Sequence, residues 1–301
     1  MAAPTMAQDT QVWDPDNAGN DGGSAGNGIW DQGTTQNWFN DSFSTADDVF
    51  ESGDSAVFNA TPGAGEGVVN VVGTVEANNV VVNEDGYSIV GVGTLDVNGQ
   101  LNVTNAGDTL TVSAALGSDV TVNGAGTTDI AGGVDGTLTV NGVATTTVNL
   151  TSTVTGNLDT NNGTTVVDTG GNVQGTTDIT SSEVNVINDG ILTGATTVNN
   201  GGTLDVDNGD VGDVENTAGG TVEISGGNVN SLDNTAGDTT ITNGTIDTTT
   251  NVDAGLVTVQ GGTLTGDVTV QGGELTTTGA TVVITGDTTV SAGGTFDVDN
   301  G

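Results

Sequence analysis

Short triplets of apolar, polar and apolar residues recur along most of this chain and restrict the folds open to it. Asn-Gly and Asp-Gly turns lie between many of them. A period of two places the apolar side chains on one face of a strand and the polar side chain on the other. Asn, Asp and Gly accept the positive φ that tight turns demand. The sequence therefore predicts an all-β protein of short strands. The triplets are Leu95/Val97, Leu101/Val103, Leu110/Val112, Val120/Val122, Leu138/Val140, Val184/Val186, Leu204/Val206, Val222/Ile224, Val257/Val259, Val268/Val270 and Phe296/Val298.

The spacing of glycine anchors predicts how these strands are connected. Anchors that resemble Gly-Gly-Thr are separated by 18, 18, 24, 11 and 21 positions, and the steps of 24 and 11 indicate anchors on different sides of one coil. A repeat of about 20 residues with two or three short strands is typical of a parallel β-solenoid. From Thr94 onward we expect parallel pairing between successive coils, with Leu204 beside Val222. The anchors are Gly201, Gly219, Gly237, Gly261, Gly272 and Gly293.

An antiparallel sandwich is the alternative fold, because Asn-Gly between alternating strands is also a hairpin signal. Two features favour the solenoid. From Ser88 to the end the only aromatic residue is Phe296, whereas a sandwich core of this length normally uses aromatic side chains. The strands are also very short for free-standing hairpins.

The aromatic residues and prolines divide the chain into two regions of different composition. All three tryptophans, Trp13, Trp30 and Trp38, and all three prolines lie in the first 62 residues. We therefore predict a leader remnant and an aromatic-rich N-terminal cap over residues 1–66, and a β-solenoid array over residues 67–301 that is truncated at its C-terminal end. The start, Thr5 to Gln8, resembles the small-residue end of a signal peptide.

The charge balance excludes several classes of function. The 301 residues include 39 Asp or Glu and no Lys, Arg, His or Cys, for a net charge of −39. Without cations the chain cannot neutralise nucleic-acid phosphates or be drawn to an anionic membrane surface. Without His, Lys or Cys it cannot form a Ser-His-Asp triad, a Schiff base or a thiolate nucleophile. No apolar run approaches the about 18 residues of a membrane span, so we expect no direct membrane insertion of this segment.

Three segments carry a resemblance to a known family. The "Trp…Asn-Trp" of Ile29–Trp38, the "Gly-Asp-x-Ala-x-Phe" of Gly53–Phe58 and the "Gly-Tyr-x-Ile-x-Gly" of Gly86–Gly91 precede Leu-x-Val and Asn-Gly repeats. In this order they resemble the opening of an autotransporter (type V secretion) passenger domain with autotransporter-associated β-strand repeats. Over Thr94–Gly301 the match is weaker.

The resemblance implies a right-handed parallel β-helix that a C-terminal β-barrel exports across the outer membrane to the bacterial cell surface. Family members act as adhesins, aggregation factors or structural stalks. The partners implied are host or neighbouring-cell surfaces, glycans, or other copies in self-association. The absence of Lys and Arg departs from familiar members. A self-assembling matrix or surface-layer component is a further alternative.

Paired carboxylates are the only candidates for catalysis. Asp205/Asp207 and Asp297/Asp299 are spaced i and i+2, which places each pair on one outward face about 6.6 Å apart. Such a pair could serve a carbohydrate-active β-helix enzyme as acid and nucleophile. The stretch Asp207 to Glu215, among the densest in acidic residues, is expected to be a loop that could hide a buried pair. A solvated polar face explains the same residues, and we predict that the chain is not an enzyme.

Calcium is the one metal that hard oxygen ligands favour here. The calcium candidates are Asp14, Asp16, Asp21, Asp207 and Asp210, and no other cofactor is expected. The stretch from Asp14 to Asp21 resembles half of an EF-hand loop, but Ala18 breaks its spacing and no Glu closes it. The three tryptophans could stack on sugars, yet we predict that they pack inside the cap.

Overall fold

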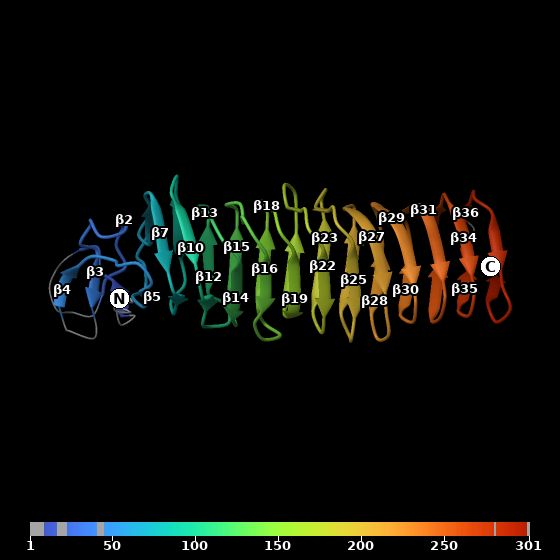
Figure 1. Cartoon of the computed structure of the whole chain (residues 1–301), viewed down its shortest axis with the longest axis horizontal. Coiled ribbons are helices and arrows are strands. Elements are labelled where there is room, and N and C mark those ends of the chain that lie inside the picture. Colours follow the sequence, from blue (N-terminus) through green and yellow to red (C-terminus); the bar gives the residue numbers. More distant parts are fainter. Residues whose placement is uncertain (1–8, 17–22, 41–44, 280, 300–301) are drawn as a thin grey trace, which may run out of the picture. The chain divides into compact units, whose positions relative to one another are not determined.

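The computed structural model describes residues 9–16, 23–40, 45–279 and 281–299, in which all regular elements are β-strands. The chain divides into two compact units, Met1–Val148 and Asn149–Gly301. Each unit consists largely of short parallel strands stacked coil upon coil, a β-solenoid (Figure 1). The predicted all-β, parallel class is therefore confirmed, and the sandwich is excluded. Among the described residues, no helix has the length and apolarity needed to cross a membrane.

The first unit contains three parallel ladders. They have the orders β2-β6-β9-β12-β15, β7-β10-β13 and β5-β8-β11-β14-β16. The strands are β1 (Thr10–Trp13), β2 (Gly28–Trp30), β3 (Trp38–Asn40), β4 (Thr45–Asp48), β5 (Ser55–Phe58), β6 (Val68–Val71), β7 (Thr74–Ala77), β8 (Val80–Val82), β9 (Tyr87–Gly91), β10 (Thr94–Val97), β11 (Gln100–Val103), β12 (Thr109–Val112), β13 (Ala115–Leu116), β14 (Val120–Gly124), β15 (Thr127–Ile130) and β16 (Leu138–Asn141), and β17 (Thr147–Leu150) spans the boundary between the units.

The first strands of this unit differ from the coils that follow them. β3 pairs antiparallel with both β1 and β4, whereas β1 also pairs in parallel with β5. Trp13, Trp30, Trp38 and Phe58 are 0% exposed and Tyr87 is 1% exposed. The ring centroids of Trp13 and Trp38 lie 5.0 Å apart, and those of Phe58 and Tyr87 lie 4.9 Å apart. The tryptophans are thus packed inside the unit, as predicted, and have no face available for a sugar.

In the second unit one ladder runs through β20-β23-β26-β28-β30-β32-β35-β38. Leu204 pairs with Val222 in this ladder, as the 18-residue step predicts. Two further ladders, β18-β21-β24 and β19-β22-β25, both lead to β27. The strands are β18 (Thr153–Val154), β19 (Leu158–Asn162), β20 (Thr164–Val167), β21 (Asn172–Val173), β22 (Thr177–Thr180), β23 (Glu183–Ile187), β24 (Ile191–Leu192), β25 (Thr196–Asn199), β26 (Thr203–Asp207), β27 (Asp210–Asn216), β28 (Thr221–Ile224), β29 (Asn228–Asn234), β30 (Asp238–Ile241), β31 (Thr245–Val252), β32 (Leu256–Val259), β33 (Gly262–Leu264), β34 (Asp267–Val270), β35 (Glu274–Thr277), β36 (Val282–Ile284), β37 (Thr288–Val290) and β38 (Thr295–Val298).

Three long strands complete the second unit. β24 and β25 are separate short strands, but both pair with the single strand β27. β27 continues to β29 and β31, and β31 then pairs with two short strands, β33 and β34. The acidic stretch Asp207 to Glu215, expected as a loop, therefore lies largely in strand β27. Its Val211 and Val214 are buried, and this burial holds the stretch in the ladder.

The glycine anchors explain the irregular steps that the sequence shows. Gly261 comes directly before β33, whereas the other five anchors precede strands of the long ladder through β26 and β38. The anchor missing from that series is Gly255, which precedes β32 and has a φ of +75°. Gly219 has a φ of +80°, a conformation that favours glycine.

Burial follows the predicted triplets except at the last one. Ten of the eleven triplets place both apolar residues inside, at 0% or 1% exposure. Phe296 and Val298 keep the register by pairing with Leu275 and Thr277, but Val298 is 51% exposed. No described strand pairs with the other edge of β38, so the burial predicted for this triplet is wrong.

Candidate functional site

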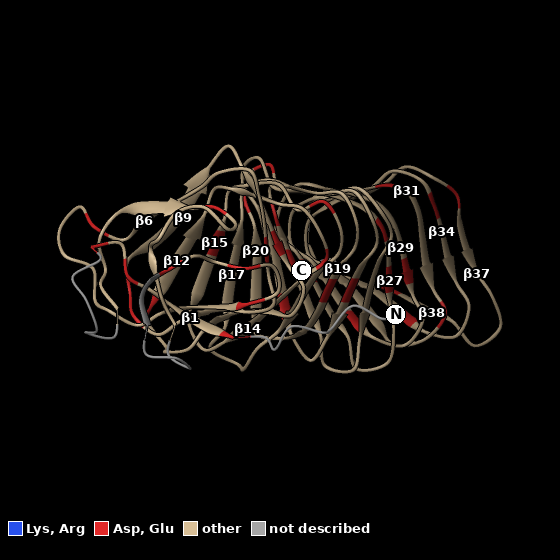
Figure 2. Cartoon of the chain, turned by 60° about the vertical axis from the view of Figure 1, so that its left-hand side comes forward, with Lys and Arg blue, Asp and Glu red and all other residues tan. Residues whose placement is uncertain are grey.

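Acidic residues recur along the strands and in the turns (Figure 2), and most of those described are half-buried or exposed. In the second unit they form rows, because each coil adds one residue at the same register position. One row consists of Thr197, Glu215, Asp233 and Asn251, on β25, β27, β29 and β31. Neighbouring members of such a row are separated by the strand spacing of about 4.8 Å.

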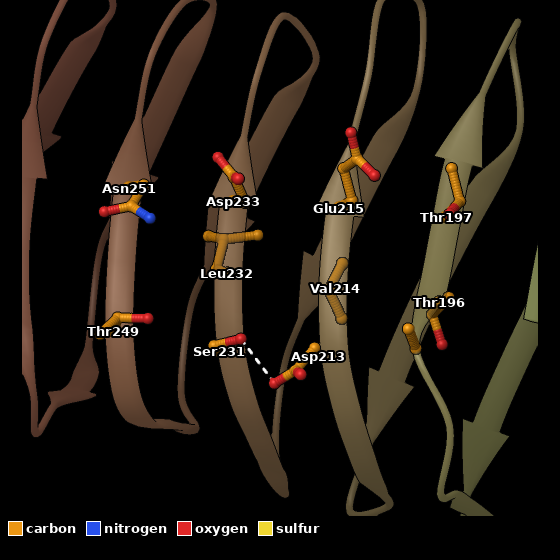
Figure 3. Close-up of a pocket in the computed structure, with 11 residues that line it drawn as sticks. Thr196, Thr197, Asp213, Val214, Glu215, Ser231, Leu232, Asp233, Thr249 and Asn251 are labelled. Carbon is orange, nitrogen blue, oxygen red and sulfur yellow. Dashed lines mark hydrogen bonds between the residues drawn. The ribbon is translucent and has the colours of Figure 1, made fainter. Parts of the chain in front are cut away.

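A groove of about 280 Å³ lies on this surface between two such rows. The second row is Asp213, Ser231 and Thr249, two positions before the first row on β27, β29 and β31. Figure 3 shows Glu215 and Asp233 on neighbouring strands at one level of the groove, with Asp213 and Ser231 at the next. The groove is lined by Ala195, Thr196, Thr197, Asp213, Val214, Glu215, Ser231, Leu232, Asp233, Thr249 and Asn251.

Two carboxylates in the groove have opposite electrostatic environments. Oδ1 of Asp213 accepts hydrogen bonds of 2.6 Å from Ser231 Oγ and 2.6 Å from Asn230 Nδ2, which lower the pKa of Asp213. Desolvation raises the pKa of Asp233, and the negative charges of Asp253 and Glu215 add to this effect. Hydrogen bonds to the ionised form and burial shift a carboxyl pKa in opposite directions. The groove therefore combines an acid that stays ionised with one that is protonated more readily.

A second hollow of about 370 Å³ lies over the first halves of the long strands. Asp210, Asn228, Asn230 and Asp247 contribute its polar side chains. Asn228 Nδ2 donates a hydrogen bond of 2.9 Å to Asp210 Oδ1. The two hollows share the strands β27, β29 and β31, and Asn230, which lines this hollow, donates to Asp213 of the groove.

The carboxylate pairs predicted from sequence lie on the other ladder, away from the groove. Asp205 is half-buried and pairs in register with Glu223, while Asp207 is exposed. Desolvation raises the pKa of Asp205, and Glu223, Asp207 and Glu183 raise it further. Asp297 and Asp299 are both exposed. Asp207, Asp297 and Asp299 therefore belong to a solvated polar face, and Asp205 is half-buried beside like charges.

The calcium candidates do not gather at one place in the described residues. Asp14 is buried and Asp16 is exposed, while Asp21 lies outside the described residues. Asp207 and Asp210 are exposed at the two ends of a short turn. Over the described ranges, no group of three or more acidic side chains is arranged to hold a metal ion. Calcium binding stays a prediction.

Glu215, Ser231 and Asp233 were not singled out as site residues from the sequence. Their common signal is the coil period, because Glu215 and Asp233 are 18 positions apart and therefore adjacent in the ladder. Asp213 lies inside the acidic stretch that the sequence pointed to, but its partners come from the next coil. Recognising the groove requires the register of each coil against the next.

Comparison with known proteins adds no identification. No protein-family model matches the chain, and searches of the curated proteins and of the solved structures found no match.

Proposed function

We propose that this chain is a non-enzymatic passenger domain of a bacterial surface protein, acting outside the cell as an adhesin, an aggregation factor or a structural stalk. The observation that carries the proposal is the in-register row Thr197, Glu215, Asp233 and Asn251. A solenoid places the polar side chains of such a row at the strand spacing of about 4.8 Å and offers a partner several regularly spaced contacts. Many weak contacts made together give high avidity.

The passenger-like motifs of the N-terminal region support this assignment through the places they occupy. Asp54 of the "Gly-Asp-x-Ala-x-Phe" segment is 5% exposed and accepts a hydrogen bond of 3.1 Å from the Asp9 N–H. Phe58 of the same segment packs 4.9 Å from Tyr87 of the next motif, measured between ring centroids. The motif residues Asp54, Phe58 and Tyr87 thus contribute packing and hydrogen bonds within the N-terminal region.

The partner chemistry follows from the charge. With a net charge of −39, the surface repels anionic glycans and other acidic chains at low salt. Neutral or cationic glycans on a host or neighbouring cell fit better, as does self-association through shared divalent cations.

Surface display tests the proposal directly. The chain is fused to an outer-membrane exporter on a non-adherent bacterial strain, and cell settling and attachment to glycan-coated surfaces are measured. We expect faster settling or stronger attachment than with the exporter alone. Unchanged behaviour, with display verified by an antibody against an added tag, would exclude the adhesin and aggregation roles and leave only the stalk.

A carbohydrate-active enzyme is the second candidate, favoured by the opposite pKa shifts of Asp213 and Asp233 within one groove. Such divergence is how acid and base roles are divided between carboxylates. Retaining glycosidases hold their two carboxyl groups about 5–5.5 Å apart, close to the strand spacing that separates Glu215 from Asp233. In this reading Asp233 is the general acid and Glu215 the nucleophile.

Release of reducing ends from pectin, alginate and neutral β-glucans separates the two candidates. The enzyme reading predicts turnover that Asp233→Asn and Glu215→Gln abolish, with a smaller loss for Asp213→Asn. Asp207→Asn and Asp210→Asn, which lie outside the groove lining, serve as controls and keep the activity. No release by the wild-type chain, together with settling in the display assay, favours the presentation role.

A further inference from the structure

Two asparagines and a threonine form one hydrogen-bonded group among the polar side chains buried in the second unit. Asn216 and Asn234 are 0% exposed and Thr239 is 1% exposed. Asn216 occupies the same interior column as Val198, and Asn234 the same column as Val252. Polar side chains therefore replace valine in two successive coils, although burying an amide is costly unless it is hydrogen-bonded.

Three of their hydrogen bonds join neighbouring coils, and two lie within one coil. Asn216 Nδ2 donates to the Asp238 carbonyl oxygen at 2.9 Å and to Thr239 Oγ1 at 3.1 Å, both in the next coil. Asn234 Nδ2 donates to the carbonyl oxygens of Gly237 and Ala254, each at 2.8 Å. Thr239 Oγ1 in turn donates to Asn234 Oδ1 at 3.1 Å.

Glycines make room for both amides. A Cβ atom at Gly220 or Gly237 would collide with the amide of Asn216, and one at Gly255 would lie 3.0 Å from Asn234 Nδ2. The sequence Asn-Thr-Ala-Gly occurs at 216–219 and again at 234–237, one coil later. The next coil has Val-Asp-Ala-Gly at 252–255, without the Asn. The amides thus occupy a specific place in two coils and are absent from the equivalent place in the third.

The rest of the interior says little about which coil stacks on which. Val211 pairs with Val229, and Val229 with Ile246, so similar side chains follow one another in a column. A ladder displaced by one whole coil would keep the inward and outward alternation that normally specifies register. A one-coil displacement would instead separate Asn216 Nδ2 from Thr239 Oγ1 and Asn234 Nδ2 from the Ala254 carbonyl oxygen, and a buried amide that loses hydrogen bonds carries a penalty.

We propose that Asn216, Asn234 and Thr239 form a buried clasp that fixes the register of stacking between neighbouring coils. The best-attested use of a buried polar group is to specify register at some cost in stability. The clasp concerns how the solenoid assembles, and it stands whether or not the surface function proposed above is correct.

Engineered disulfides can report the register, because the chain contains no cysteine. Asp213, Ser231 and Thr249 are consecutive in one outward row. Cysteines at 213 and 249 are two strands apart, about 9.6 Å, too far for a disulfide, whose Cα atoms must lie within about 7 Å. A slip of one coil makes them neighbours. The pair Asp213→Cys with Ser231→Cys reports the native register.

The pair Asp213→Cys with Thr249→Cys, called the slip pair because it can cross-link only after a slip of one coil, is placed in two proteins. One is the clasp-free variant Asn216→Val/Asn234→Val/Thr239→Val, and the other is a control variant in which three buried threonines outside the clasp are changed. The control is Thr165→Val/Thr177→Val/Thr196→Val, whose hydroxyl groups have no hydrogen-bond partner in the structure. Both proteins are unfolded in urea, refolded and oxidised, and the cross-linked fraction is measured by mass spectrometry.

We expect the slip cross-link to rise about tenfold or more in the clasp-free variant and to stay at the wild-type level in the control, because an unpaired buried amide is what disfavours the slipped pairing. Equal cross-linking in the two variants would overturn the proposal. A clasp-free variant that no longer unfolds cooperatively would also overturn it, because the network would then supply stability that apolar side chains cannot replace.

Discussion

Asparagine has two different roles in this chain, and its surroundings decide which one a given residue takes. Asn200 and Asn208 lie in turns with φ of +47° and +61°, the conformation for which Asn is suited. Asn216 and Asn234 lie at the ends of β27 and β29 with their side chains inside. The Asn-Gly pattern predicts turns at Asn200 and Asn208, whereas it makes no prediction for Asn216 and Asn234, which precede Thr. The buried role depends on carbonyl groups of the next coil, which no local pattern reveals.

Removing one buried amide should be costly. Asn234→Ala removes the side-chain donor to the carbonyl oxygens of Gly237 and Ala254 and the acceptor of Thr239, although the Gly237 carbonyl oxygen keeps the Leu256 N–H. We expect the free energy of unfolding to fall by about 2–4 kcal/mol. Urea denaturation of the variant beside Asn243→Ala, an exposed Asn, measures this, and the control should stay within about 0.5 kcal/mol of wild type. Equal stabilities for the two variants would contradict the prediction.

The ladders determine which side chains meet at the scale of strands. The triplets and glycine steps were sufficient to predict parallel pairing, because each triplet needs a buried face and an 18-residue step leaves only the next coil to pair with. They could not predict that the two separate strands β24 and β25 both pair with the single strand β27. That pairing depends on the chain remaining extended through Gly212, inside β27. Nor could they predict the groove, whose Asp213 and Ser231 meet only across two coils.

Close approach between coils constrains some glycines more than others. A Cβ atom at Gly266 would collide with the carbonyl oxygen of Thr248 in the preceding coil. Gly266→Ala should therefore lower the free energy of unfolding by about 1–3 kcal/mol, the usual cost of overpacking. Thr265→Ala, an exposed change at the neighbouring position, is the control and should be close to neutral in thermal denaturation. A neutral Gly266→Ala would show that the coils separate easily at this corner.

In-register carboxylates should make stability depend on pH. The pKa of Asp205 is raised by desolvation and by Glu223, so the folded state binds the proton more tightly than the unfolded state does. The resulting destabilisation is fully present above the folded-state pKa and is relieved as the pH falls toward the unfolded value of about 3.9. Asp205→Asn should raise the free energy of unfolding at pH 7 by about 0.2–1 kcal/mol, the range for cross-strand pairs.

The same substitution at Asp213 should have the opposite sign. Hydrogen bonds from Ser231 and Asn230 lower the pKa of Asp213, so its carboxylate contributes stability above the unfolded pKa of about 3.9 and loses it as the pH falls through the folded value. Asp213→Asn should destabilise the protein at pH 7, and the difference should vanish at low pH. Denaturation curves of both variants at pH 7 and pH 3 test the pair, and changes of the same sign at pH 7 would refute the assigned environments.

Every charged side chain of the molecule is negative, which sets the long-range electrostatics of the whole chain. The net charge is −39 with no Lys or Arg to offset it, and neighbouring strands repeat the charges in register, as in Asp205 with Glu223 and Glu76 with Asp96. Burial of the apolar columns and the backbone ladders must outweigh this repulsion. Composition alone predicts the repulsion, but its concentration into rows follows from the register.

Added salt should therefore stabilise the protein, and calcium should do so more strongly. Ions shorten the screening length from about 30 Å at 0.01 M ionic strength to about 8 Å at 0.15 M, which weakens repulsion between separate rows. A divalent cation can also lie between adjacent carboxylates such as Asp205 and Glu223. We expect the Tm to rise with NaCl, and to rise further when CaCl₂ replaces NaCl at equal ionic strength. Asp205→Asn/Glu223→Gln should reduce the extra calcium effect but not the NaCl effect. A Tm that stays constant from low salt to millimolar calcium would contradict both the repulsion between exposed rows and any role for cations on this surface.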